Sequence, residues 1–199
     1  MLNDRLQQQI AFIVEADKLK NILRRTPLID ASRLENSAEH SWHLMLLAMV
    51  LHEYQAEKCD LLRVFEMMIV HDLVEIDAGD TFAYDTDGQL TRTDREQEAA
   101  KRIFGLLPPD QEARLRGLWE EFEEQKTPDA RFANAIDRFQ PLLQNAHAGG
   151  GSWESYGVRR DQVLRRMAPV ESAAPELWSV VLKVVEEFSA SGVIRPDAP

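Results

Sequence analysis

Apolar residues recur every three to four positions over most of the chain, which is the spacing of helices with one buried face. Residues 4–24 predict an amphipathic helix with Leu6, Ile10 and Ile13 on one side. Pro27 ends this helix, since the residue before a proline is disfavoured in the helical conformation. No stretch alternates apolar and polar residues as a half-buried strand does. The pattern therefore predicts an all-α fold.

Polar residues mark where the later helices begin. Asn36 or Ser37 predicts the start of the second helix, which continues to about Tyr54, and Glu39 is placed to complete a capping box. The polar segment 77–93 predicts a long loop. Further helices are expected over 61–76, with Asp60 as the cap, and over 94–105, 109–124, 128–147, 159–168 and 174–190. Since no linker or repeat divides the chain, we expect one domain over residues 1–199.

Composition narrows the class of protein. Apolar residues make up 44% of the 199 residues, which is enough for a core and too many for a disordered chain. Cys59 is the single cysteine, which excludes an internal disulfide and a multi-cysteine zinc site. The longest apolar run, Leu44 to Leu51, is too short to span a bilayer, and the first residues lack a signal-peptide pattern. We therefore expect a cytoplasmic protein that does not bind a membrane.

Charge is unevenly distributed along the chain. The sequence has 34 acidic and 23 basic residues, a net charge of −11. Much of the excess lies between Glu66 and Glu98, where ten carboxylates accompany only Arg92 and Arg95. Binding of a nucleic-acid polymer requires clustered lysine and arginine side chains, so this balance argues against such a partner.

His71, Asp72 and Glu75 lie in the expected helix over 61–76, which is otherwise apolar on nearly every side. Glu75 shares a face with both partners, because it follows His71 by four residues and Asp72 by three. A buried carboxylate needs a partner, and a divalent cation accepts imidazole and carboxylate ligands. A core histidine beside a helix-end aspartate is the alternative explanation.

Two further positions are less decisive by pattern alone. His40 and His43 lie one turn apart at the start of the second helix. This spacing fits two histidines that bind one metal ion, and it fits equally two structural histidines above an apolar stripe. Asp137 has the polar neighbours Asn134 and Gln140 three residues away on either side. Periodicity therefore predicts that Asp137 is a solvent-exposed aspartate.

The order His40, His71-Asp72, Asp137 resembles the His…His-Asp…Asp signature of the HD-domain metal-dependent phosphohydrolases. The resemblance is strongest to the branch of the deoxyribonucleoside 5′-monophosphatases, covers about residues 15–165, and implies a single HD-domain helical bundle. It is carried by the strings RLENSAEHSWH from Arg33, VHDLVEIDAGD from Val70, NAID from Asn134 and GGGSW from Gly149.

Transferred residue by residue, the resemblance implies roles for seven side chains. The ligands of one divalent metal ion would be His40, His71, Asp72 and Asp137; Glu75 and Asp80 would be catalytic, with Asp80 near the leaving oxygen; Arg25 would hold the substrate phosphate. Monophosphatases with the clearest deoxyribose preference have Trp after that arginine, where this chain has Thr26. The resemblance thus implies hydrolysis of (deoxy)ribonucleoside 5′-monophosphates and leaves the sugar preference open.

The number and type of metal ions follow from the ligand set. Two imidazoles and two carboxylates suit Mn, Co, Fe, Ni or Zn better than Mg. Related HD enzymes with two metals have extra histidines before the last aspartate, and none occurs here between Asp72 and Ala146. We therefore expect one ion.

Several alternatives stay open. The family resemblance suggests a homodimer, and the apolar stripe from Leu177 to Phe188 fits either core packing or a dimer surface. The chain could also be a non-catalytic metal- or nucleotide-binding regulatory module, a hydrolase of another small phosphate ester, or a helical interaction protein without metal. The sequence does not assign roles to His43, His147 and Trp153.

Overall fold

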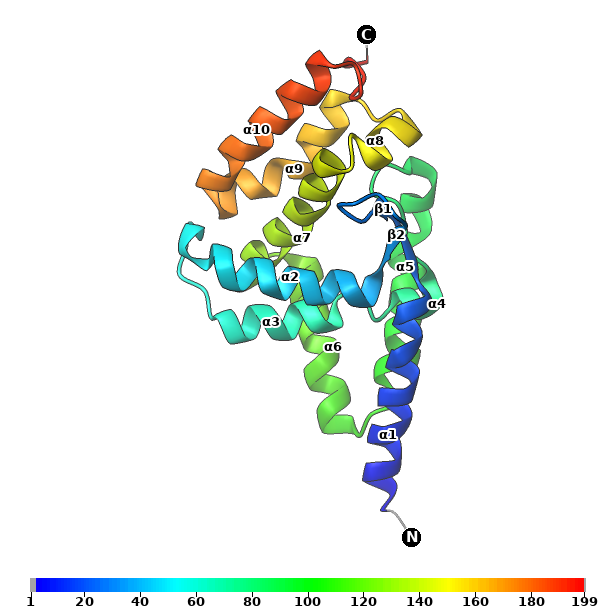
Figure 1. Cartoon of the computed structure of the whole chain (residues 1–199). Coiled ribbons are helices and arrows are strands. Elements are labelled where there is room, and N and C mark those ends of the chain that lie inside the picture. The colour runs from blue at the N-terminus through cyan, green and yellow to red at the C-terminus, as the bar shows by residue number, and fades with distance from the viewer. Residues whose placement is uncertain (1–2, 199) are drawn as a thin grey trace.

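The computed structural model describes residues 3–198, and most of them are helical, as predicted (Figure 1). Its elements are, in order, α1 (Asp4–Ala16), the 3₁₀ helix η1 (Asp17–Asn21), β1 (Leu23–Pro27), β2 (Leu34–Asn36), α2 (Ser37–Leu51), the 3₁₀ helix η2 (His52–Tyr54), α3 (Leu61–Val70), α4 (Glu75–Ala78), α5 (Thr86–Phe104), α6 (Pro109–Glu124), α7 (Pro128–His147), α8 (Gly151–Tyr156), α9 (Arg160–Ala173) and α10 (Pro175–Ala190).

Helix α7 is the central element. It contacts α2, α3, α6, α8, α9, α10 and β1, so it is buried on most of its sides. Phe132, Ile136 and Leu142 of α7 and Val64 and Met67 of α3 belong to one cluster of buried apolar side chains. Figure 1 shows α2 and α3 stacked side by side against this helix, with α9 and α10 beyond it. The candidate site lies where α2, α3 and α7 meet.

The predicted start signals of two helices are confirmed. The Asn36 side chain accepts hydrogen bonds from the backbone N–H groups of Ala38 and Glu39, and the Glu39 side chain accepts one from the Asn36 N–H, which completes the capping box of α2. Asp60 accepts from the Leu62 N–H and caps α3. These local bonds satisfy N–H groups that a helix leaves without partners in its first turn.

The expectation of a helix over 4–24 and of no strands is wrong. Helix α1 ends at Ala16, and β1 pairs antiparallel with β2 as a short hairpin. The strand escapes detection because its inward positions are polar: Thr26 is buried and Arg24 pairs with carboxylates of the site, while Arg25 is exposed. A strand with polar residues on its buried face has no apolar alternation.

The expected helix boundaries also shift around the site. The predicted helix over 61–76 stops at Val70, and Glu75 starts the separate short helix α4. The predicted loop 77–93 is partly helical, since Asp85 caps α5 by accepting from the Gly88 N–H. Helix α9 continues through Pro169 to Ala173, beyond the predicted end at 168. A proline removes one helical hydrogen bond, which the packing of α9 against α7 and α10 offsets.

Helix α8 begins at Gly151, the last of three consecutive glycines, where the sequence predicts only a turn. Gly151 has φ 45°, in the left-handed region, and an added Cβ there would lie 2.5 Å from the Asn145 side-chain oxygen and 3.0 Å from Cγ of Pro27. Glycine therefore allows α8 to pack against the hairpin. Trp153 of α8 is buried, and its ring lies 5.6 Å from that of Phe188.

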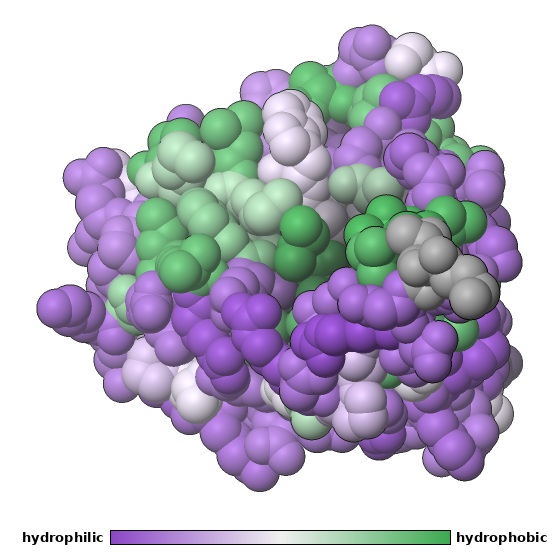
Figure 2. Space-filling model, turned by 90° about the horizontal axis from the view of Figure 1, so that it is seen from below, coloured by the Kyte–Doolittle hydropathy of each residue, from purple (hydrophilic) through white to green (hydrophobic). Residues whose placement is uncertain are grey.

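Some apolar side chains stay exposed. Leu6, Ile10, Ile13 and Val14 of α1 are exposed rather than buried in the core, although Leu19 after it is buried. Figure 2 shows apolar side chains gathered over broad areas of the face at which α1 begins. Other large apolar residues that stay exposed are Trp42, Leu46, Met49 and Val50 of α2 and Leu62 and Ile69 of α3. No helix in residues 3–198 is long and apolar enough to cross a membrane.

Candidate metal centre

The four predicted ligands converge from three elements. His40 lies in the first turn of α2, His71 and Asp72 follow directly after α3, and Asp137 lies in the middle of α7. Single donor atoms of His40, His71 and Asp72 all lie within 4.8 Å of one another. Asp137 Oδ1 lies 3.0 Å from His40 Nε2 and 3.8 Å from His71 Nε2. We call these four side chains the floor of the site.

Asp137 is buried, so the expectation of a solvent-exposed aspartate from periodicity is wrong. The polar neighbours that suggested exposure are buried as well, and both bind protein partners. Asn134 donates to the carbonyl of Phe122, and Gln140 contacts His40. A polar stripe on a helix can thus face a buried site instead of solvent.

The hydrogen bonds of His40 determine which of its nitrogens can bind a metal. Its Nδ1 lies 3.1 Å from Gln140 Oε1, and the Gln140 amide is oriented by its Nε2 donating to Glu35 Oε1 at 2.7 Å. Because an amide oxygen only accepts, His40 Nδ1 donates, and in the neutral ring Nε2 carries the lone pair. Nε2 lies 3.0 Å from Asp137 Oδ1, where a protonated Nε2 donates to the carboxylate and a metal ion would take the place of that proton.

His71 shows the same arrangement. Its Nδ1 donates to the carbonyl oxygen of Met68 at 2.9 Å, which leaves the lone pair on Nε2. Nε2 is buried and has no hydrogen-bond partner among the described residues, although Asp72 Oδ1 lies only 3.0 Å away. Burial opposes protonation of both imidazoles, but the carboxylates around them outweigh burial and raise the pKa of His40 and of His71. The nitrogens and the carboxylates therefore require a cation between them, either a proton on each Nε2 or a shared metal ion. A divalent metal ion with mixed nitrogen and oxygen ligands fits this donor set.

The ionisation of these groups reflects their mutual proximity. Burial alone would raise the pKa of Asp72, but the protonated form of His71 and the Arg24 guanidinium outweigh burial and lower this pKa to about 2. Burial would also raise the pKa of Asp137, but the hydrogen bond from protonated His40 and the charge of Arg166 outweigh burial. They hold this pKa well below its ordinary range. Both carboxylates are therefore ionised at neutral pH, as metal ligands must be.

Glu75 and Asp80 lie beside the floor. Glu75 is buried and accepts a hydrogen bond from the Ser37 hydroxyl at 2.7 Å, and burial together with Asp72 raises its pKa well above the ordinary value. Gly79, with φ 72°, turns the chain after α4 toward Asp80, whose pKa burial also raises. Arg95 of α5 donates to the Ala78 carbonyl and, at 2.8 Å, to the Thr81 hydroxyl, which fixes this segment.

The hairpin contributes two arginines in different positions. Arg24, which the sequence did not single out, donates to Asp72 Oδ2 at 2.9 Å and lies 3.6 Å from Glu35. Arg25, the predicted phosphate ligand, is exposed; it donates to the Tyr156 hydroxyl at 3.3 Å, and its guanidinium lies 5.9 Å from the centre of that ring. The two side chains lie on opposite faces because successive residues of a strand alternate in direction. This difference can be predicted only once the segment is recognised as a strand.

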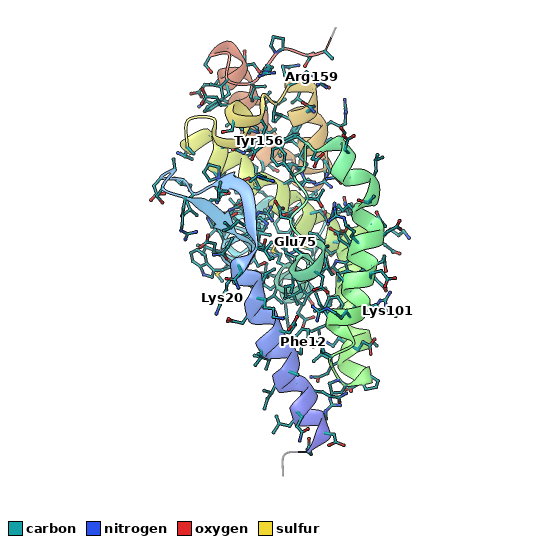
Figure 3. All side chains as sticks on the ribbon, turned by 90° about the vertical axis from the view of Figure 1, so that its right-hand side faces the viewer. Phe12, Lys20, Glu75, Lys101, Tyr156 and Arg159 are labelled. Atoms are coloured by element: carbon teal, nitrogen blue, oxygen red, sulfur yellow. The ribbon has the colours of Figure 1, made fainter. Side chains whose placement is uncertain are left out.

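His71, Asp72 and Asp137 line a cavity of about 990 Å³, part of which is open to solvent. A second hollow adjoins it and is lined by Arg25, Phe82, Tyr84 and Tyr156, among others. The Phe82 ring lies 4.7 Å from that of Tyr156 and 5.2 Å from that of Tyr84. We call these four residues the mouth. Figure 3 looks onto this side of the molecule, with Glu75 between the hairpin and α5 and with Tyr156 above it.

Three arginines that the sequence analysis missed also line the main cavity: Arg92 of α5, Arg138 of α7 and Arg166 of α9. Burial and the neighbouring Arg166 lower the pKa of Arg138 to about 10, which still leaves it a cation at neutral pH. No motif marks these positions, because each arginine comes from a different helix.

The remaining residues without an assigned role divide between packing and the cavity. His43 Nδ1 accepts a hydrogen bond from Gln140 at 3.1 Å, so it supports the side chain that orients His40. His147 is exposed at the end of α7. Trp153 both lines the main cavity and packs against Phe188.

Comparisons with known proteins agree with this geometry. A family model described as HD domain matches residues 16–178. A crystal structure of a protein described as a predicted metal-dependent phosphohydrolase from Magnetospirillum magnetotacticum MS-1 is similar with a TM-score of 0.91 and 47% identity, covering 98% of this chain and 100% of that one. The PH0347 protein of Pyrococcus horikoshii OT3 has a TM-score of 0.63 at 21% identity, covering 89% of this chain and 98% of that one, which shows the fold alone.

A curated relative is named 5′-deoxynucleotidase. The human (Homo sapiens) 5′-deoxynucleotidase HDDC2 is 32% identical over 115 residues, which are 58% of this chain and 55% of the human protein. This chain spans about half the length of the curated relatives that it matches most strongly.

Proposed function

This chain belongs to the HD-domain family, and from that premise we propose that it is a metal-dependent phosphomonoesterase. Its proposed substrates are ribo- and deoxyribonucleoside 5′-monophosphates, a class suggested by the relatives named 5′-deoxynucleotidase. One observation carries the proposal. The Nε2 atoms of His40 and His71 lie 3.0 Å from Asp137 Oδ1 and from Asp72 Oδ1, and His71 Nε2 has no hydrogen-bond partner among the described residues.

The floor residues would hold one divalent ion. When bound, such an ion lowers the pKa of a water molecule and offsets negative charge that develops on the phosphoryl group. Gln140 and the Met68 carbonyl keep both histidines in the ligating tautomer. The donor set favours Mn, Co, Fe, Ni or Zn over Mg, which prefers oxygen ligands alone.

Glu75 and Asp80 would move the protons. Glu75, held by Ser37, orients the attacking water and accepts its proton, for which a carboxylate with a raised pKa is a suitable base. Asp80, whose pKa burial raises, would supply a proton to the leaving 5′-oxygen. The result is a nucleoside and inorganic phosphate.

The hairpin and the mouth would select the substrate. Arg25 would contact the substrate phosphate at the entrance, because its guanidinium fork matches two phosphate oxygens. The rings of Phe82 and Tyr156 offer apolar faces to a base. Thr26 lines the cavity where the relatives with deoxyribose preference have Trp, so we expect ribose to be accepted as well.

A phosphate-release screen tests this function. All ribo- and deoxyribonucleoside 5′-monophosphates are incubated with the purified protein and each of Mn, Co, Fe, Ni, Zn and Mg. We expect release that a chelator abolishes, and a loss of about 100-fold to 10,000-fold for Glu75→Gln with its metal content unchanged. Negligible release from every nucleotide contradicts the proposed substrate class.

The same screen separates the alternatives. Bound metal and nucleotide without turnover would indicate a regulatory module, and release only from other small phosphate esters would indicate a different hydrolase. A protein that binds no metal at all would be the helical interaction protein. The net charge of −11 supports a small anion attracted by the metal over a nucleic-acid polymer.

We also propose that the chain forms a homodimer through the exposed apolar faces of α1 and α2. Helix α2 has no lysine, arginine or acidic residue after Glu39, yet Trp42, Met49 and Val50 are more than half exposed. Homodimer interfaces are more apolar than ordinary surfaces, so a second copy suits this face. Light scattering should give twice the chain mass, and the double variant Met49→Glu/Val50→Glu should give the monomer. A wild-type monomer contradicts the dimer.

A further inference from the structure

Arg92, Arg138 and Arg166 line the same cavity as the floor, but their charges are balanced to different degrees. Arg92 is fully paired, since its Nε donates to Glu96 at 2.7 Å and its Nη2 lies 3.3 Å from Glu123. A guanidinium held by two carboxylates has little electrostatic attraction left for a ligand. Arg92 therefore acts as part of the wall.

The positive charge of Arg138 is balanced least by neighbouring carboxylates. Within residues 3–198, its side chain makes one hydrogen bond, from Nη1 to the carbonyl oxygen of Arg166 at 3.3 Å, and no ion pair with a carboxylate. Its Nε is buried and lacks a hydrogen-bond partner among residues 3–198. A partly buried cation in this state is unfavourable unless an anion accompanies it. The cavity is where such an anion can enter.

Arg166 is connected to the floor. Its Nη2 donates to Asp137 Oδ2 at 3.5 Å, a long bond, and its carbonyl is the acceptor for Arg138. If Asp137 binds a divalent ion, the negative charge of Asp137 is shared with that ion, and its attraction for Arg166 falls. Two neighbouring guanidinium groups then lack a full counter-charge, one of them in contact with a metal ligand.

We propose that Arg138 and Arg166 together hold the phosphate group of the substrate beside the metal floor. This inference rests on the proposed function, and it adds two substrate contacts that lie deeper than Arg25. Guanidinium groups bind phosphate oxygens through paired N–H donors, and a terminal phosphate offers three such oxygens to the arginines and the metal. The pair therefore favours monoesters, whose phosphate is not blocked at its outer end.

The proposal makes two opposite predictions for Arg138→Gln. Without ligand, the variant should unfold at a higher temperature than the wild type, because a buried unpaired charge is removed. With inorganic phosphate as the probe, its phosphate Kd should weaken by about 10-fold to 100-fold, the usual value of a hydrogen bond to a charged group. A purely structural arginine would instead destabilise the protein when removed and leave phosphate binding unchanged.

Binding is measured by calorimetry and by thermal unfolding against phosphate at constant ionic strength, once with chelator and once with Mn. Arg165→Gln is the matched control, since Arg165 precedes Arg166 on α9 and forms an exposed ion pair with Asp161. Arg138→Lys keeps the charge and loses the planar fork, so its Kd should lie between those of the wild type and Arg138→Gln. Circular dichroism verifies that each variant is folded.

The outcomes separate the two proposals. If Arg138→Gln and Arg138→Lys both bind phosphate as tightly as the wild type, or if the wild type binds no phosphate under either condition, the arginine pair is not an anion site. If phosphate binding depends on Arg138 while no nucleotide is hydrolysed, the anion site is supported and the proposed function fails. Weakened binding by Arg165→Gln to the same degree also overturns the assignment, because the effect would then reflect general charge.

Discussion

The floor and the mouth of the cavity are built by different parts of the fold. The floor residues lie on or directly after α2, α3 and α7, helices whose buried side chains form the core. His40 is fully buried, and each histidine is oriented by a hydrogen bond from its Nδ1. Tight packing restricts side chains to one position, so the floor is rigid before any ligand arrives.

The mouth is made of less regular segments. Arg25 lies on a two-stranded hairpin, Phe82 and Tyr84 on the segment before α5, and Tyr156 on the six-residue helix α8. Arg25 is exposed and Tyr156 is half exposed, and these two side chains share a hydrogen bond at 3.3 Å, whereas Phe82 and Tyr84 are partly buried against the core. Segments with few buried contacts move and vary more easily than a core does. We infer that the floor determines the chemistry and the mouth determines which molecule undergoes it.

The largest effect should come from a floor ligand. Asp72→Ala removes a carboxylate whose Oδ1 lies 3.0 Å from His71 Nε2 and whose Oδ2 lies 4.0 Å from His40 Nε2. We expect bound metal to fall to near zero and phosphate release to fall at least about 1,000-fold, which corresponds to several kcal/mol of lost transition-state stabilisation. Metal content is measured by mass spectrometry, and release by a phosphate assay.

Asp110→Ala is the control for this substitution. Asp110 pairs with Arg5 on an exposed surface away from the floor, so its loss should change neither metal content nor rate. Full metal content in Asp72→Ala would contradict the assignment of the floor.

An intermediate effect is expected behind the floor. Gln140→Leu removes the acceptor that fixes the Nδ1 proton of His40, without removing any ligand. Loss of such a supporting contact weakens metal affinity by about 10-fold to 100-fold. We expect a metal titration to give that shift, with activity restored at high metal concentration. Gln111→Leu removes a half-buried glutamine of α6 that accepts from Gln9 of α1 and contacts no floor residue, so it should titrate as the wild type does. A Gln140→Leu protein that titrates identically would show that other groups fix the His40 tautomer.

The burial of His71 and Asp72 could be predicted from the sequence, and the reason is local. Both residues, with Glu75 beside them, follow an apolar helix closely enough for their burial to be inferred. The capping box of α2 predicts where the helix that carries His40 begins, and leaves the role of His40 open. Asp137 could not be found this way, because its polar neighbours on α7 indicate solvent. Only the family resemblance identified Asp137 as a ligand, and only that resemblance selected His40 over His43.

The mouth and the cationic wall could not be predicted for physical reasons. The inward residues of β1 are polar because they pair with the site, so the apolar alternation that identifies strands is missing. Arg138 and Arg166 lie on separate helices and meet only through the packing of α7 against α9. A charged residue of this kind looks like solvated surface until the tertiary structure places it.

The smallest effect should come from the mouth. Tyr156→Ala removes a ring that contacts Phe82 at 4.7 Å and accepts a hydrogen bond from Arg25. We expect the nucleotide KM to rise about twofold to tenfold, the energy of one aromatic contact, while kcat and metal content stay within error of the wild type. Tyr156→Phe keeps the ring and loses only the hydroxyl, so its KM should stay closer to the wild-type value. If Tyr156→Ala instead lowered kcat or metal content, the mouth would be coupled to the floor, and the division between chemistry and selection would fail.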